Sequence, residues 1–237
     1  MGSPNLGVIT DGVALPKEGK GFRRLRPWST SYVGTPGLVK TLELAGARVA
    51  PRETDPPLLV GDIAAPRGGR LPGHASHRSG RDVDLLFFYT TPSGVPVPSP
   101  GFVKVGADGL AQIADAKGIS YVRLDVPRTW ELAKALLESP HADVAWLFVA
   151  EWVEALLIDY ARAKGESPHL VWRAESVMLQ PKDSFPHDDH FHLRVRCSDD
   201  EAVAGCVDGA PHWPWLPARP TLRDDVLAET LRELSEG

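Results

Sequence analysis

Two short stretches of the chain concentrate side chains that bind metal ions or transfer protons. The first, GHASHRSGRDVDLLFF (residues 73–88), places His74, His77 and two aspartates in front of an apolar run. The second, PHDDHFHLRVRC (residues 186–197), holds three further histidines. Imidazole and carboxylate groups that meet at one point form either a metal centre or an acid–base pair. Because five of the eight histidines lie in these stretches, we expect the two stretches to converge in the fold.

Zinc explains such a convergence best, because catalytic zinc sites use three nitrogen or oxygen ligands from the protein and leave a fourth position for water. Six residues, a glycine among them, separate His77 from Asp84, so a loop can bring this imidazole and this carboxylate to one ion. On an alternating strand, His190 and His192 point to the same face. His192 can then complete the triad, while His190, roughly 6–7 Å along the strand, reaches a water at the ion.

The nearby acid and the remaining histidines have simpler interpretations. Asp82 is expected either to fix the tautomer of an imidazole ligand or to be an acid that faces solvent or braces the loop. A zinc-stabilised binding module without turnover is the alternative to an enzyme, although a structural zinc site is closed by four ligands and does not need His187 and His190 beside it. No HExxH motif occurs in the chain, so a glutamate base is not supported. Isolated histidines are expected at the surface: His141, His169 and His212.

Apolar periodicity predicts the elements that position these residues. The run LLFF (residues 85–88) identifies a buried strand, on which Asp82, Asp84 and Leu86 share a face. Alternation predicts a strand over the second histidine stretch, and further strands are expected over residues 58–63 and 144–149. Helical spacing occurs over residues 36–47, 127–138, 151–164 and 221–236. Strands and helices do not alternate strictly, which favours an α+β fold with an antiparallel central sheet, flanking helices and long Pro/Gly-rich loops.

Length and composition predict a soluble globular protein. The 237 residues are expected to form one domain over residues 21–216, between a flexible segment (1–20) and a C-terminal packing or dimerising helix (217–237). Apolar residues make up 43% of the chain and charged residues 24%. A net charge of −5 and the lack of a basic run longer than FRRLR argue against a nucleic-acid partner. No apolar run reaches the length of a membrane span.

The first residues and the two cysteines bear on the compartment in which the protein works. The stretch MGSPNLGVITDG lacks the basic start and apolar core of a secretory signal, which leaves either a cytosolic protein or one whose signal has been removed. Cys197 and Cys206 are enough for one disulfide, which would contribute roughly 2–3 kcal/mol on the chain-entropy model, or they are two reduced thiols.

The longer strings around the two stretches resemble a known family. LLVGDIAAPRGGRLPGHASHRSGRDVD and HDDHFHLRVRC, with RLRPWSTSYVGTPGLVKTLELAGARV upstream, are similar to penicillin-insensitive murein endopeptidases. The underlying pattern of His, six residues, Asp and a distant His-x-His resembles the wider group of zinc peptidases that includes lysostaphin and the D-Ala-D-Ala peptidases. The resemblance extends over roughly residues 21–206.

This resemblance implies an α+β zinc hydrolase of the cell envelope, periplasmic or secreted, whose substrate is peptidoglycan or its muropeptide fragments. It implies cleavage of D-Ala–meso-diaminopimelate cross-links, insensitive to β-lactams because there is no serine nucleophile to acylate. A carboxypeptidase, a dipeptidase or an amidase with the same core is the alternative within hydrolases. The resemblance assigns no substrate-binding residue and no oligomeric state.

Site residues carried over by position fall into ligands and reacting groups. The resemblance implies that His77, Asp84 and His192 bind zinc, with His74 as an additional or alternate ligand. It further implies that His190 and His187 serve the reaction. Relatives build an accessory metal site from Asp-Gly-x-His, where this chain has the sequence DGLA (residues 108–111), so one catalytic Zn²⁺ is expected. The resemblance also favours pairing of the two cysteines near the second histidine strand.

Overall fold

The largest sheet of the protein carries both histidine stretches at its centre. A computed structural model describes residues 1–116, 118–182 and 184–217. In this sheet the strands follow the order β14 (Met178–Leu179), β13 (Val144–Phe148), β15 (His190–Val195), β8 (Asp82–Leu86), β7 (Leu58–Val60), β5 (Phe22–Arg24) and β4 (Glu18–Gly19). The four predicted strands are confirmed as β7, β8, β13 and β15, with ends that differ by up to four residues.

The sheet is mixed, and the expectation of an antiparallel central sheet is therefore only partly correct. The four strands β13, β15, β8 and β7 pair antiparallel, but β13 pairs parallel with β14, and β5 pairs parallel with β7. Parallel neighbours need a crossover connection, usually a helix. Helix α1 (Pro36–Val49) lies between β5 and β7 in the chain, and helices α3 (Glu151–Lys164) and α4 (Pro168–Val177) lie between β13 and β14. Two local βαβ units thus occur inside a sequence without strict overall alternation.

Alternation along the central strands gives the sheet two different faces. His192 pairs with Asp84, and Arg194 pairs with Asp82, across β15 and β8. The intervening residues Val83, Leu85, Phe191 and Leu193 are fully buried in the apolar core. Because successive side chains of a strand point to opposite faces, the charged residues line one face. We call this surface, which carries Asp82, Asp84, His190, His192 and Arg194, the site face.

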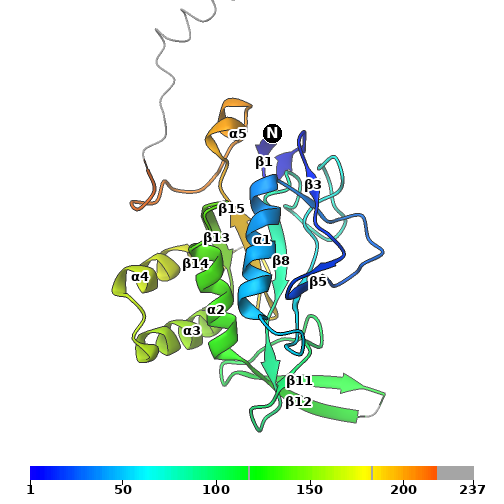
Figure 1. Ribbon diagram of the computed structural model, residues 1–237, viewed down its shortest axis with the longest axis vertical. Helices are drawn as coiled ribbons and strands as arrows, with labels where there is room; N and C mark the ends of the chain where they lie inside the picture. The colour runs from blue at the N-terminus through cyan, green and yellow to red at the C-terminus, as the bar shows by residue number, and fades with distance from the viewer. Residues whose placement is uncertain (117, 183, 218–237) are drawn as a thin grey trace, which may run out of the picture.

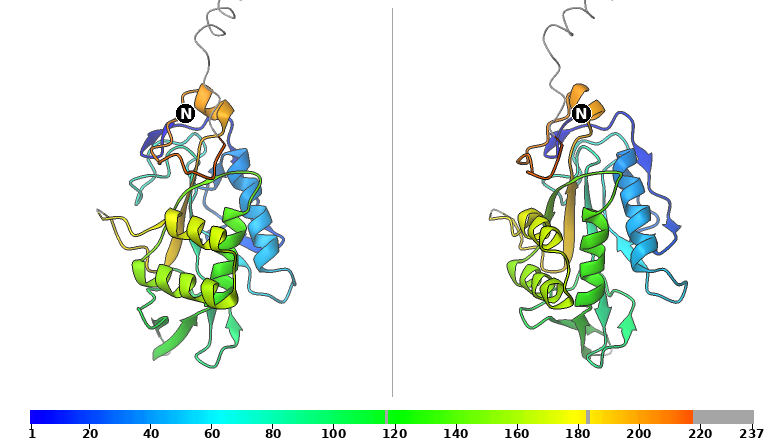
Figure 2. Two further views of the ribbon diagram at one scale, coloured as in Figure 1. Left: turned by 90° about the vertical axis from the view of Figure 1, so that its left-hand side faces the viewer. Right: turned by 60° about the vertical axis from the view of Figure 1, so that its left-hand side comes forward.

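The opposite face packs against helices (Figures 1 and 2). Helix α1 contacts α2 (Val126–Leu137), and α3 and α4 pack beside α2 at the end of the sheet that β14 forms. Thr35, Asp125 and Ser167 cap α1, α2 and α4 by accepting from backbone N–H groups of the first turn. The helix predicted over residues 151–164 is confirmed, as are those near 36–47 and 127–138; α4 was not predicted.

Residues 1–20, for which the sequence predicts flexibility, contain short strands. Strand β1 (Gly2–Ser3) pairs with β2 (Leu6–Gly7), and β3 (Val13–Ala14) pairs with β6 (Val33–Gly34). Gly2 also forms a bridge with Cys206, which is joined to Cys197 by a disulfide with a Cα–Cα distance of 6.0 Å. The disulfide closes a loop that contains α5 (Asp199–Val203) and ties the end of β15 to the N-terminal segment.

A four-stranded antiparallel sheet projects from the main body (Figure 1). Its order is β10 (Pro96–Val97), β9 (Tyr89–Thr90), β12 (Gly118–Leu124) and β11 (Leu110–Asp115). The predicted C-terminal helix lies outside the described residues, and the proposed division into segments stays a prediction. None of the described helices is long and apolar enough to cross a membrane.

Candidate metal centre

Three buried side chains on and beside the site face present one atom each to a common point. His77 Nε2, Asp84 Oδ1 and His192 Nδ1 are separated by 3.3, 3.4 and 3.3 Å. Four ligands arranged tetrahedrally at zinc-to-ligand distances near 2.0–2.1 Å lie about 3.3–3.4 Å apart. The triangle therefore has the size that a tetrahedral zinc ion requires. The structure thus brings the two histidine stretches together, as the sequence predicts.

The unpartnered carboxylate oxygen of Asp84 is a second indication that the centre fits a cation. Its Oδ1 atom is buried and accepts no hydrogen bond from any described residue, although His190 Nε2 also lies 3.4 Å away. Buried polar atoms are rarely left in this state, and a cation between the rings would satisfy it. Burial opposes ionisation of Asp84, but the surrounding imidazoles, His77 first among them, outweigh burial and hold its pKa well below the usual range.

Hydrogen bonds from the far side of each ring fix which nitrogen faces the centre. His77 Nδ1 donates to the Ile63 carbonyl oxygen at 2.8 Å, which leaves Nε2 free. His192 Nε2 donates to Asp82 Oδ1 at 2.9 Å, which leaves Nδ1 free. Carboxylate and carbonyl partners of this kind are typical of histidines that bind metals. Asp82 was expected either to fix the tautomer of an imidazole ligand or to face solvent or brace the loop. The observed contact with His192 matches the first of these interpretations.

Asp82 is fully buried and also accepts from Arg194 Nε at 2.7 Å. Burial would raise the pKa of Asp82, but the hydrogen bond from His192 and the charge of Arg194 hold it below the usual range. The carboxylate is therefore ionised and restrains a ring and a guanidinium at once. The sequence did not indicate this role for Arg194, which stands two positions beyond His192 on the same face.

The backbone at two histidines is strained. His77 and His187 have φ angles of 61° and 56°, in the left-handed region that residues other than glycine seldom adopt. Strain of this kind clusters at functional sites, where the surrounding structure holds it in place. Neither position could be recognised from the sequence, since neither is a glycine.

His74 lies at the edge of the triangle. Its Nε2 is 3.2 Å from Asp62 Oδ2, and its Nδ1 is 3.9 Å from Asp84 Oδ2. Ligand atoms of His74, His77 and Asp84 all lie within 4.8 Å of one another, so this trio is a second possible ligand set. Asp62 is itself paired with Arg26. Sequence reasoning missed Asp62 as a site residue, although it lies within the predicted strand over residues 58–63.

The remaining two histidines of the second stretch have opposite electrostatic environments. Burial lowers the pKa of His190, but contacts with Asp189 and Asp84 outweigh burial and raise it to about 9. Burial, together with nearby His192 and His190, lowers the pKa of His187 to about 4. Their ring centroids lie 5.1 Å apart. A ring that is protonated at neutral pH and a ring that is neutral thus stand side by side next to Asp84.

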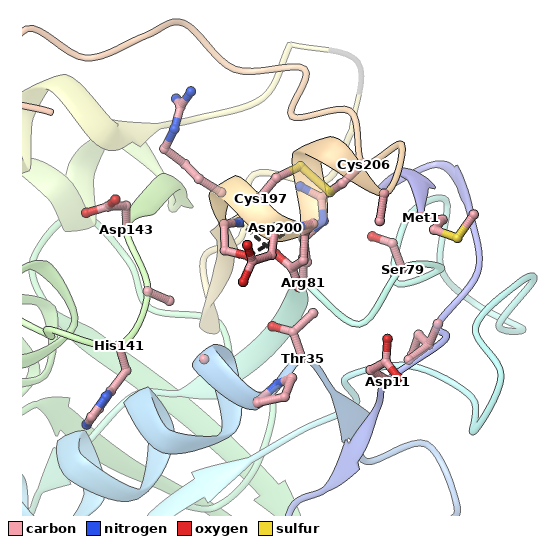
Figure 3. Close-up of a pocket in the computed structure, with 18 of the residues that line it drawn as sticks. Met1, Asp11, Thr35, Ser79, Arg81, His141, Asp143, Cys197, Asp200 and Cys206 are labelled. Atoms are coloured by element: carbon pink, nitrogen blue, oxygen red, sulfur yellow. Dashed lines mark hydrogen bonds between the residues drawn. A yellow bond between two sulfur atoms is a disulfide. The ribbon is translucent and has the colours of Figure 1, made fainter. Parts of the chain in front are cut away.

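These groups form the floor of an open cleft of about 690 Å³. Its walls include segment 181–189 without the undescribed residue 183, and residues that the sequence did not single out: Phe102, Lys104, Phe148 and Arg194. A second cavity of about 570 Å³ lies at the other end of β8 and β15, beside the disulfide (Figure 3). It is lined by His141 but by none of the triangle residues, so it is separate from the candidate metal centre.

Two imidazoles and a carboxylate, buried at the floor of an open cleft and braced from behind, define a candidate metal centre of the hydrolase kind. Comparison with known proteins narrows this class. The model of the penicillin-insensitive murein endopeptidase family matches residues 1–214, and the chain belongs to this family. The resemblance seen in the sequence is thus confirmed.

Relatives in several bacteria carry the family name "Penicillin-insensitive murein endopeptidase". The protein of Haemophilus influenzae is 30% identical over 226 residues, which cover 89% of this chain and 67% of the relative. The protein of Klebsiella pneumoniae is 27% identical over 218 residues, which cover 90% of this chain and 71% of the relative. That of Yersinia pestis is 27% identical over 212 residues, with 85% and 66% covered.

Proposed function

We propose that the protein is a zinc-dependent endopeptidase that hydrolyses peptide cross-links of peptidoglycan, of the D-Ala–meso-diaminopimelate type. Membership of the murein endopeptidase family supports the substrate class. The observation that carries the metal dependence is the triangle of His77 Nε2, Asp84 Oδ1 and His192 Nδ1, whose sides of 3.3–3.4 Å suit tetrahedral zinc.

In this proposal His77, Asp84 and His192 hold one zinc ion, and His74 is an additional or alternate ligand. Two neutral imidazoles and one carboxylate leave such a site with a net positive charge. A zinc ion bound there supplies a water of lowered pKa, near ~7, and polarises the carbonyl of the scissile bond. Asp82 and the Ile63 carbonyl oxygen keep both rings in the ligating tautomer.

His190 is the proposed general base. Asp189 holds its Nδ1, so Nε2 is directed to Asp84 and the cleft. Without a bound cation, Asp189 and Asp84 raise the pKa of this ring to about 9 and keep it protonated at neutral pH. A cation held by Asp84 would offset that carboxylate's charge and lower the pKa, which would let the ring accept a proton. A ring placed beside the attacking water can take its proton and pass it to the leaving amine. His187 has a lowered pKa and stays neutral near pH 7, so its part is to donate a hydrogen bond toward the carbonyl oxygen.

A periplasmic or secreted location follows from this substrate. The disulfide between Cys197 and Cys206 supports it, since disulfides persist in oxidising compartments and are unusual in the cytosol. Peptidoglycan or soluble muropeptides are the proposed partners.

Digestion of purified muropeptides with mass analysis of the fragments tests the proposal. Cross-linked dimers should yield monomers, and a chelator should abolish the reaction until zinc is restored. Loss of a terminal D-Ala, or release of the whole stem peptide from the sugar, would instead indicate a carboxypeptidase or an amidase. Protein that binds sacculi but releases no fragment with zinc present would be a zinc-stabilised binding module.

A further inference from the structure

A row of aromatic side chains runs from the candidate metal centre over the outward side of β13 to helix α4. Phe148 lies with its ring centroid 5.4 Å from that of His192, and 6.1 Å from that of Trp146. Trp146 contacts Trp213 at 5.1 Å, and Trp213 stacks on Trp215 at 5.3 Å. Trp215 in turn contacts Trp172 of α4 at 4.9 Å. We call these five residues the aromatic strip.

The strip borders the helix-covered core, and Trp213 and Trp215 pack against it while staying partly exposed. Trp146 and Phe148 alternate on β13 with the fully buried Ala145 and Leu147, so they face away from the helices. Both are only partly buried, and Trp172 is 43% exposed. An outward face of a sheet is normally polar, because exposed aromatic area gains nothing from folding. A contiguous row of such rings usually indicates a binding surface.

The strip is also held rigid. Trp213 Nε1 donates to the Ala145 carbonyl oxygen at 3.1 Å, which fastens residues 213–215 to β13. The Arg173 guanidinium lies 5.6 Å from the centroid of the Trp215 ring, and the Arg194 guanidinium lies 5.4 Å from that of Phe148. Rings fixed in this way lose little conformational entropy when a ligand binds, and the two guanidinium groups provide hydrogen-bond donors beside the row.

We propose that the aromatic strip binds the glycan strand of peptidoglycan next to the cross-link in the cleft. This inference rests on the proposed function. The electron-rich face of an aromatic ring attracts the partly positive C–H groups of a sugar ring, and guanidinium donors suit the hydroxyl and acetamido oxygens of amino sugars. Phe148 belongs to the strip and also lines the cleft, and Arg194 lines the cleft beside it, so a polymer can occupy both at once.

The continuity with the cleft favours a glycan over a second copy of the chain. A cross-link in peptidoglycan is always attached through its stem peptides to glycan strands, so a surface that begins at the cleft lies where a strand must pass. The strip is a single row of rings. Stable interfaces between protein copies bury a broad apolar patch, typically about 800 Å² on each partner.

The direct test uses full-length protein and chitotetraose, an N-acetylglucosamine tetramer without any peptide bond. Binding should change the tryptophan fluorescence, and Trp172→Ala should weaken it about fivefold to tenfold, the usual effect of losing one stacked ring. Trp172→Phe should recover most of the affinity. The matched control is Tyr121→Ala, which removes an aromatic ring 50% exposed on the distant β12 and should change nothing.

A second measurement separates this inference from the proposed reaction. Trp172→Ala should raise the KM for intact sacculi by a similar factor and leave the rate on a sugar-free cross-linked peptide unchanged. Because chitotetraose binding needs no catalysis, a protein without peptidase activity that still binds it supports the strip and contradicts the proposed function. Equal affinity of parent and Trp172→Ala for both chitotetraose and sacculi would overturn the strip. Loss of self-association in Trp172→Ala during sedimentation, without an effect on sugar, would assign the strip to a second copy and also overturn it.

Discussion

Replacing Asp82 by Asn tests whether the carboxylate behind His192 organises the candidate metal centre. The side chain keeps its shape, so packing is preserved while one charge is lost. Asp82 Oδ1 now accepts from His192 at 2.9 Å and from Arg194 at 2.7 Å, and Oδ2 faces the backbone N–H of His77 at 3.4 Å. If the Asn oxygen accepts from His192 and Arg194, the amide NH2 group faces the backbone N–H of His77, which is also a donor. If the amide is flipped, the NH2 group faces the donors of His192 and Arg194 instead.

Either orientation leaves Arg194 without its buried counter-charge. Hydrogen bonds to charged groups contribute about 1.5–3 kcal/mol each. In the better orientation the donors of His192 and Arg194 keep an acceptor, but the neutral amide oxygen accepts more weakly than the carboxylate. We therefore expect the free energy of unfolding to fall by roughly 1.5–3 kcal/mol near neutral pH. Zinc affinity should fall about 10- to 100-fold, since a neutral amide oxygen holds His192 in the ligating tautomer less firmly than a carboxylate, and a flipped amide does not hold it at all.

The pH dependence of this loss has a definite sign. The pKa of Asp82 in the folded protein lies below its unfolded value, so the stabilisation is fully present above about pH 4 and is lost as the pH falls toward the folded pKa. Thermal unfolding of the metal-free proteins should show parent and Asp82→Asn converging in acid. Zinc affinity is measured by competition with a chromogenic chelator. Asp159→Asn, on the exposed side of α3, is the control, and unchanged affinity and stability in Asp82→Asn would refute this account.

Three further predictions concern the ligands, the base and a remote acid. Asp84→Ala should lose both bound zinc and activity, because it removes one of three ligands; a fully occupied variant by elemental analysis would exclude Asp84 as a ligand. His190→Ala should bind zinc normally and lose about 10²–10⁴ in kcat, whereas a metal-free variant would make His190 a ligand. Burial and neighbouring carboxylates raise the pKa of Glu154 to about 7. Ionisation of this side chain therefore destabilises the folded state increasingly as the pH rises above 4.5. Glu154→Gln should match the parent near pH 4 and exceed it by about 1–2 kcal/mol above pH 8, after allowance for partial exposure; an equal difference at both pH values would contradict the assigned pKa.

The sequence predicted the convergence of the site because both halves rest on local patterns. A histidine and an acid six residues apart, and two histidines on an alternating strand, limit where the side chains can point whatever surrounds them. The same logic located the four central strands of the main sheet and three helices. The parallel pairs at β5–β7 and β13–β14 were missed, because parallel pairing depends on where a crossover helix returns the chain, and no local pattern records that.

Residues around the centre were harder to predict when their role depends on a distant partner. Asp62 and Arg194 have ordinary sequence surroundings, and only the pairing of β7, β15 and β8 brings them to His74 and Asp82. The strained φ angles of His77 and His187 likewise arise from how the loops are held at both ends.

The strand over residues 144–149 shows how an apolar pattern can hide a functional face. Its sequence VAWLFV has no polar residue, and the sequence predicted a strand there without showing which side chains face solvent. Only Val144, Ala145, Leu147 and Val149 are buried, whereas Trp146 and Phe148 face the cleft side. A continuous apolar strand is compatible with two arrangements. Either both of its faces are packed against other layers of the protein, or one face is packed and the other binds an apolar face of a ligand. The helices cover only one side here, and the uncovered side carries the aromatic strip that we propose as a surface for a ligand.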